Sequence, residues 1–194
     1  MINIGLIGES PYDTVALKHL LQQKYDTGYR YSILLKNVTG DHLNTPKAIR
    51  AVVSEIKVKQ PDIVVVIRDA DGLESNMDAI RHKQEWYKNL SGQMNRRSLF
   101  LLNIYELEAL IFADIDTFNT HYKTSIKGNR NVTYIVKPKD ELMRKTIEQK
   151  KYAESHCPEL FKALKIDIVS KNCTYFKEFL DEFSQLLDGD EKPT

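Results

Sequence analysis

The chain has 194 residues, enough for one compact domain with an appendage. Its 28 basic and 27 acidic residues leave a formal net charge of +1, so the composition as a whole supplies no attraction to nucleic acid or to a membrane surface. No apolar run approaches the roughly 20 residues of a membrane span and no N-terminal signal pattern is present, so we expect a cytoplasmic protein with no membrane partner.

The first 112 residues alternate between strand-like and helix-like patterns. The expected strands cover residues 2–7, 29–35, 63–67 and 98–104, and the expected helices begin near Pro11 and cover 45–59 and 76–94. Thr45 and Pro46 supply an N-cap and a first-turn proline. The run of residues 63–67 is apolar on both faces, which is typical of a central parallel strand covered by helices. The sequence therefore predicts an α/β fold with a parallel sheet flanked by helices.

The alternation stops after Asp116. A polar segment at residues 127–131 predicts a mobile loop, and helical patterns follow at 140–154, 158–164 and 174–187. We expect an α/β core over residues 1–115, a helical C-terminal extension packed on it over 116–187, and a disordered tail over 188–194. Cys157 and Cys173 have neither C-x-x-C spacing nor histidines in ligand register, which argues against zinc and predicts reduced, partly buried thiols.

Carboxylates follow three of the predicted strands. Glu9 comes after the first strand, Asp69 and Asp71 after the third, and Glu106 and Glu108 after the fourth. Residues two apart in an extended segment point the same way, so the two aspartates should project together and repel each other unless a cation lies between them. Each acidic residue alone has a structural explanation, as a cap, a turn former or a first-turn residue. Together they predict an oxygen-only site for Mg²⁺ or Mn²⁺ at one edge of the sheet.

The order of these motifs resembles the Toprim domain, the metal-binding core of topoisomerases, primases and several nucleases. The segment Glu106-Leu107-Glu108-Ala109-Leu110-Ile111-Phe112-Ala113-Asp114 is similar to one in an uncharacterised bacterial Toprim-like family of defence-associated proteins, with Leu110 where an aromatic residue is usual. Lys137-Pro138-Lys139 weakly resembles a Pro-Lys element that precedes a helix in that family. The resemblance implies a Toprim/Rossmann-like sheet.

The resemblance also implies roles for these side chains. Glu9 would be the general base or a shared metal ligand, Asp69 and Asp71 would hold Mg²⁺, and Glu108 would complete the ligand set, with Glu106 as a further member. Lys139, or Lys137, would neutralise charge that develops on a phosphate, although both lysines also fit a solvated approach to a helix. Arg96, Arg97 and Lys137 are the candidate contacts to a nucleic-acid backbone, or else ordinary solvated surface.

These observations favour a magnesium-dependent nucleic-acid phosphodiesterase, an endonuclease of Toprim type, in a bacterial defence or DNA-processing system. The alternative is a non-catalytic Toprim module that binds nucleic acid or an associated ATPase. A phosphatase with an aspartate nucleophile ranks third, because phosphatases of the Asp-x-Asp type carry that pair after their first strand. The sequence leaves open the choice between DNA and RNA, the number of metal ions and the oligomeric state.

Overall fold

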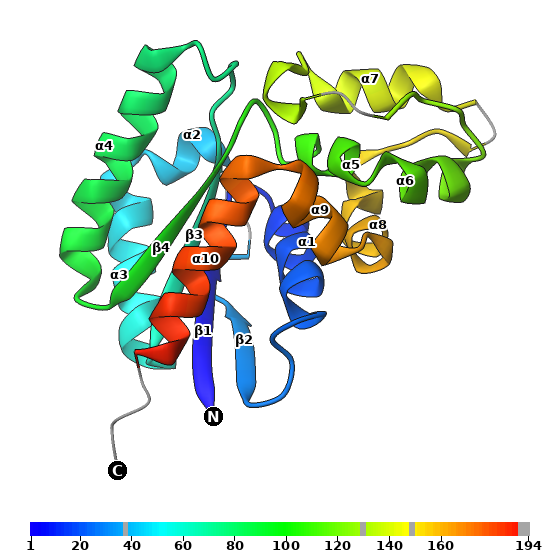
Figure 1. The fold of residues 1–194 in the computed structure, drawn as a ribbon. Coiled ribbons are helices and arrows are strands. Elements are labelled where there is room, and N and C mark those ends of the chain that lie inside the picture. Colours follow the sequence, from blue (N-terminus) through cyan, green and yellow to red (C-terminus); the bar gives the residue numbers. More distant parts are fainter. Residues whose placement is uncertain (37–38, 129–130, 148–149, 190–194) are drawn as a thin grey trace.

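A four-stranded parallel sheet forms the centre of the protein, which we describe from a computed structural model over residues 1–36, 39–128, 131–147 and 150–189 (Figure 1). The strand order is β2-β1-β3-β4. The strands are β1 (Ile2–Ile7), β2 (Tyr29–Ile33), β3 (Ile63–Asp69) and β4 (Arg97–Asn103). The predicted α/β fold with a parallel sheet flanked by helices and followed by C-terminal helices is confirmed.

The two faces of the sheet are covered by different sets of helices. Within β3 the side chains alternate, so Val65 belongs to one apolar cluster and Val64 and Val66 belong to the other. The smaller cluster packs under α2 (Gly40–Leu43), α3 (Pro46–Lys59) and α4 (Met77–Met94). The larger cluster lies under α1 (Pro11–Gln22) and the helices that follow β4. Burial on both faces explains why β3 reads as an unbroken apolar run.

Local sequence signals set where most of these helices begin. Ser10 caps α1 by accepting from the Tyr12 N–H at 3.1 Å, and Thr45 caps α3 through Ala48. Asn76 does the same for α4. Side-chain caps satisfy amide groups that have no partner inside the helix, so these starts are legible in the sequence. The predicted helix starts at Thr45 and Asn76 differ from the observed ones by a single cap residue.

After β4 the chain is helical. The elements are α5 (Ala109–Ala113), α6 (Ile115–Tyr122), η1 (Val132–Tyr134), α7 (Pro138–Lys145), η3 (Glu154–His156), α8 (Cys157–Ala163), α9 (Ile166–Asn172) and α10 (Thr174–Asp188). The helix predicted over 140–154 is wrong in extent, because α7 ends at Lys145 and Thr146 has an extended backbone. Residues 129–130 of the predicted loop, residues 148–149 and tail residues 190–194 lie outside the described residues.

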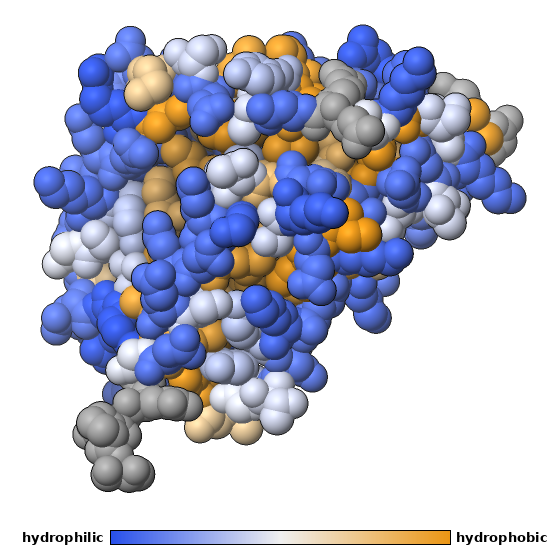
Figure 2. Space-filling model, in the orientation of Figure 1, coloured by the Kyte–Doolittle hydropathy of each residue, from blue (hydrophilic) through white to orange (hydrophobic). Residues whose placement is uncertain are grey.

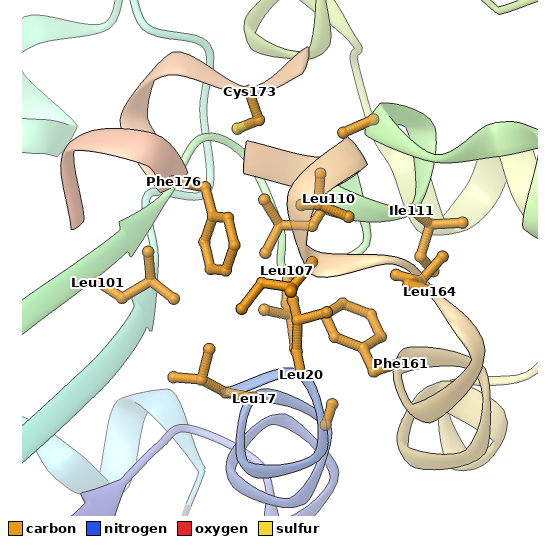
Figure 3. Close-up of a cluster of buried hydrophobic side chains, with 14 of the residues drawn as sticks. Leu17, Leu20, Leu101, Leu107, Leu110, Ile111, Phe161, Leu164, Cys173 and Phe176 are labelled. Atoms are coloured by element: carbon orange, nitrogen blue, oxygen red, sulfur yellow. The ribbon is translucent and has the colours of Figure 1, made fainter. Parts of the chain in front are cut away.

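The C-terminal helices share one apolar cluster with the sheet. Leucines of α1 and β4 meet Phe161 of α8 and Phe176 of α10 in a common interior (Figure 3). In this arrangement α8 packs on α1, and α10 packs on β4. The two cysteines lie in this interior as free, buried thiols. Among the described residues, no helix combines the length and apolar character needed to cross a membrane.

Candidate metal centre at the carboxyl edge of the sheet

The carboxyl ends of β1, β3 and β4 meet at one edge of the sheet. Asp69 and Asn103 are partners in the register of β3 and β4, and the Asn103 Nδ2 donates to Asp69 Oδ1 at 3.1 Å. Glu9 follows β1, the other neighbour of β3. Parallel strands therefore bring residues about 60 positions apart to a common rim, where ligands bind in this class of sheet.

A buried arginine, Arg68, organises one half of this rim. Its side chain is 1% exposed, and its guanidinium forms an ion pair and hydrogen bond with Glu9. It also donates to Asn44 Oδ1 at 2.8 Å and to the Gly40 carbonyl at 3.2 Å, and it lies 4.3 Å from the centre of the Trp86 ring. A buried cation needs such partners, so Arg68 fixes the position of Glu9 against α2 and α4.

Lys83 of α4 extends this contact outward. Its Nζ lies 3.4 Å from Glu9 Oε1 and 2.8 Å from Asp71 Oδ2. We call Glu9, Arg68, Lys83 and Asp71 the ion-pair network. The expectation that Asp69 and Asp71 project together is wrong in its geometry. The strand ends at Asp69, whereas Asp71 has a left-handed backbone (φ 56°) and an exposed side chain that accepts from Lys83.

Three other carboxyl groups, Asp13, Asp69 and Glu108, form what we call the acidic cluster. Burial raises the pKa of Asp13, and repulsion from Glu108 and Glu9 raises it further. Burial likewise raises the pKa of Asp69, with Asp13, Glu108 and Glu9 adding to the shift, although the Asn103 hydrogen bond opposes it. Glu108 therefore repels both aspartates, and Asp13 also repels Asp69, across the rim.

Glu108 is the most deeply buried member at 4% exposure, and burial raises its pKa to about 7. The Tyr152 hydroxyl donates to Glu108 Oε1 at 3.3 Å. Lys139 is the nearby cation: burial alone would lower its pKa, but attraction to Glu108, Glu154 and Glu106 raises it overall. Its Nζ lies 3.4 Å from Glu154 Oε2, so Lys139 is shared between the acidic cluster and a more exposed carboxylate.

The remaining predicted residues fall into two groups. Glu106 accepts the backbone N–H of Lys139 at 3.1 Å and so holds the first turn of α7, and Lys137 precedes that turn with an exposed side chain. Arg97 begins β4, six residues and therefore roughly 20 Å from the end that carries Asn103, and Arg96 precedes the strand. Arg97 donates to the Leu186 carbonyl of α10 at 2.9 Å. The structure therefore separates both arginines from the rim.

Several residues of the rim were not singled out from the sequence. The main ones are Asp13, Arg68, Lys83, Asn103 and Tyr152. Arg68 carried a signal, because a charged residue inside a β-branched run must find partners when the strand is buried. Asp13 gave a weaker indication, as an acidic residue in the first turn of the helix that follows β1. Tyr152 lies in an irregular segment and carried none.

The donor set suits a hard divalent cation, since it consists of carboxylate and amide oxygens. The Oδ1 atom of Asn103 is buried next to Asp69 and accepts no hydrogen bond from the described residues. This oxygen is therefore available as a metal ligand at the rim. Within the part of the chain that the structure describes, however, no three aspartate, glutamate, histidine or cysteine side chains converge closely enough to hold an ion. The chemistry fits a metal, whereas the side chains are not arranged as a ligand sphere.

The fold and rim define an α/β protein with an acid-rich site at the carboxyl edge of a parallel sheet. A family model described as a domain of unknown function, DUF4276, matches residues 10–184, so the chain belongs to this family. Comparisons with curated proteins and with solved structures gave no match.

Proposed function

We propose that this protein is a Mg²⁺- or Mn²⁺-dependent phosphodiesterase that acts on nucleic acid. The observation that carries the proposal is the acidic cluster at the sheet edge where α/β proteins bind ligands. Burial raises the pKa of Asp13, Asp69 and Glu108, and repulsion from Glu108 raises the pKa of the two aspartates further. Negative charge gathered in this way is costly without a cation. The order of motifs, which resembles the Toprim domain, supports the same assignment.

Asp13, Asp69 and Glu108 would hold the metal after moving closer together, with Asn103 as a ligand through its amide oxygen. Glu9 would be a further ligand once released from Arg68 and Lys83, and Asp71 once released from Lys83. A bound divalent ion supplies an activated water and stabilises charge on a phosphate. The chain's own contribution would come from two side chains. Glu108, whose pKa burial raises to about 7 in the metal-free protein, would lose its proton as the ion binds and would then be an ionised ligand. Lys139 keeps its positive charge beside the cluster and would offset charge on a phosphate oxygen.

The decisive experiment compares the wild-type protein with Asp69→Asn, using Asp116→Asn on the exposed surface of α6 as the matched control. Wild type and control should bind Mn²⁺ in calorimetry and cleave DNA or RNA with Mg²⁺ or Mn²⁺. Asp69→Asn should lose at least about 10-fold in Mn²⁺ affinity and lose cleavage. Its metal-free form should melt at a higher temperature, because a repelling carboxylate has been removed. Unchanged Mn²⁺ affinity in Asp69→Asn would overturn the metal assignment.

The ion-pair network favours a second candidate, a non-catalytic module that binds nucleic acid or an associated ATPase. Glu9 and Asp71 are both engaged by cations of this chain, and an occupied carboxylate is a poorer ligand or base. This candidate predicts nucleic-acid binding without cleavage at any divalent metal concentration. Cleavage that depends on Asp69 decides for the enzyme. By the resemblance, either activity would serve a bacterial defence or DNA-processing system in the cytoplasm.

A further inference from the structure

Positive charge is concentrated in the segment around α7. Nine of the 28 basic residues lie between positions 123 and 151, accompanied by three acidic residues, although the whole chain has a net charge of only +1. Within this segment, η1 and α7 contact α5, which follows the rim residue Glu108 (Figure 1). Hydrophilic and hydrophobic residues are intermixed on the upper-right face of Figure 2, where α7 lies. A local positive surface therefore adjoins the acidic cluster.

Two grooves lie on different faces of α7. The first, which we call the α7 groove, has a volume of about 500 Å³ and is lined by Val136, Lys137, Asp140, Met143, Arg144 and Lys151. The second has a volume of about 580 Å³, and its basic residues are Lys123, Lys127 and Lys145. Each groove thus combines three cations with apolar side chains and one acidic residue, so the two are closely matched in charge.

Two lining residues of the α7 groove are joined through the backbone to residues that contact the rim. On one side Lys137 leads directly into Pro138 and Lys139, and Lys139 is attached to Glu106 through its backbone N–H. On the other side Lys151 precedes Tyr152, whose hydroxyl donates to Glu108. A chain of phosphates that follows the groove would therefore lie beside residues that contact the rim.

The apolar and aromatic content of this surface distinguishes a single strand from a duplex. Val136 is 52% exposed and Tyr134, two residues earlier, is 70% exposed. Bases stack on exposed aromatic rings and contact apolar side chains, but a duplex hides its base faces. A positive groove with adjacent aromatic and aliphatic surface is the combination found in proteins that bind single strands.

We propose that the α7 groove binds the backbone of single-stranded nucleic acid through Lys137, Arg144 and Lys151, with Tyr134 as a base-stacking platform. The groove leads the strand to the acidic cluster. The statement that the strand leads to the acidic cluster rests on the proposed function. The binding itself needs no metal, so it can be tested separately.

The test measures fluorescence anisotropy of a labelled 12-nucleotide single strand, and of the same sequence as a duplex, in EDTA over a range of salt concentrations. The variant Lys137→Gln/Arg144→Gln/Lys151→Gln is compared with its matched control Lys123→Gln/Lys127→Gln/Lys145→Gln, which removes the same charge from the second groove. The first should weaken single-strand binding at least about 10-fold and reduce the slope of log K against log salt by about 2. The control should stay within about threefold of wild type. Tyr134→Ala should cost about 10-fold without changing the salt slope.

Equal losses in the two triple variants would overturn the inference, because they would show a response to net charge alone. Tighter binding of the duplex, or equal competition by polyglutamate, would overturn it as well. The outcome is separable from the proposed function because strand binding is measured in EDTA, whereas the phosphodiesterase needs a divalent ion. Groove binding without cleavage by wild type would refute the phosphodiesterase and leave the groove intact. If the groove variant cleaves as well as wild type, the groove proposal is refuted and the phosphodiesterase proposal stands.

Discussion

The ion-pair network and the acidic cluster share one sheet edge, but they differ in how their carboxylates are compensated. In the network, Glu9 and Asp71 each contact a cation of this chain, and the buried Arg68 is surrounded by partners. In the cluster, burial raises the pKa of Asp13, Asp69 and Glu108, and repulsion from nearby carboxylates raises each pKa further. The contrast teaches that part of this rim is built for stability, and that the other part carries an electrostatic cost that function would have to justify.

The largest expected effect comes from breaking the network at Arg68. Replacing Arg68 with Met should lower the free energy of unfolding by about 3–5 kcal/mol, because it leaves Glu9, Asn44 and the Gly40 carbonyl without their buried donor. Urea denaturation at pH 7 measures the change. The matched variant Lys83→Met removes a more peripheral cation whose partner Asp71 is exposed, so it should cost about 1 kcal/mol or less. Equal losses would mean that the buried pair has no special weight.

The second prediction concerns the cluster and has the opposite sign. The native pKa of Glu108 is about 7, above its ordinary value of 4.5, so the folded protein holds this proton more tightly than the unfolded chain. The contribution of this group to the free energy of unfolding is therefore fully present below about pH 4.5. It decreases by about 3 kcal/mol as the pH rises through about 7. Glu108→Gln should remove this loss, which makes the variant more stable than wild type at pH 8 and similar at pH 4.

Denaturation of wild type and Glu108→Gln in metal-free buffer at pH 4, 6 and 8 tests this directly. Glu106→Gln is the control. The Glu106 carboxylate accepts the Lys139 N–H in the first turn of α7, so removing its charge should not make the protein more stable at pH 8. A Glu108→Gln protein that is less stable than wild type at pH 8 would contradict the prediction and would place Glu108 with the stabilising carboxylates.

The sequence predicted the sheet and the long helices because their signals are local. The β-branched run of β3 and the capped starts of α3 and α4 need no knowledge of the rest of the fold. The short helix α5, Ala-Leu-Ile-Phe-Ala, is buried on every side and has no amphipathic period, so only tertiary packing defines it. α9 was missed in the same way, as a seven-residue helix stabilised by its neighbours α5 and α10.

The rim shows the same division between local and tertiary information. Placement of Glu9, Asp69 and Glu108 near one edge follows from parallel strands, which sequence patterns can indicate. The direction of Asp71 depends on a left-handed residue after the strand, and the capture of Glu9 depends on an arginine that only a folded core could bury. Partner choice among charged side chains is a tertiary property, which strand and helix periodicity do not encode.

The smallest expected effect tests whether Tyr152 eases the charge on Glu108. The Tyr152 hydroxyl is buried, and it donates to Glu108 Oε1 at 3.3 Å, a bond that favours the ionised carboxylate. Tyr152→Phe should therefore raise the pKa of Glu108 further and cost about 1 kcal/mol of unfolding free energy at pH 8, with a smaller cost at pH 5, where Glu108 holds its proton in both proteins. The pH dependence separates this from a packing defect, which would be the same at both values. In a Glu108→Gln background the difference between pH 5 and pH 8 should disappear, and its persistence there would show that Tyr152 acts on another group of the rim.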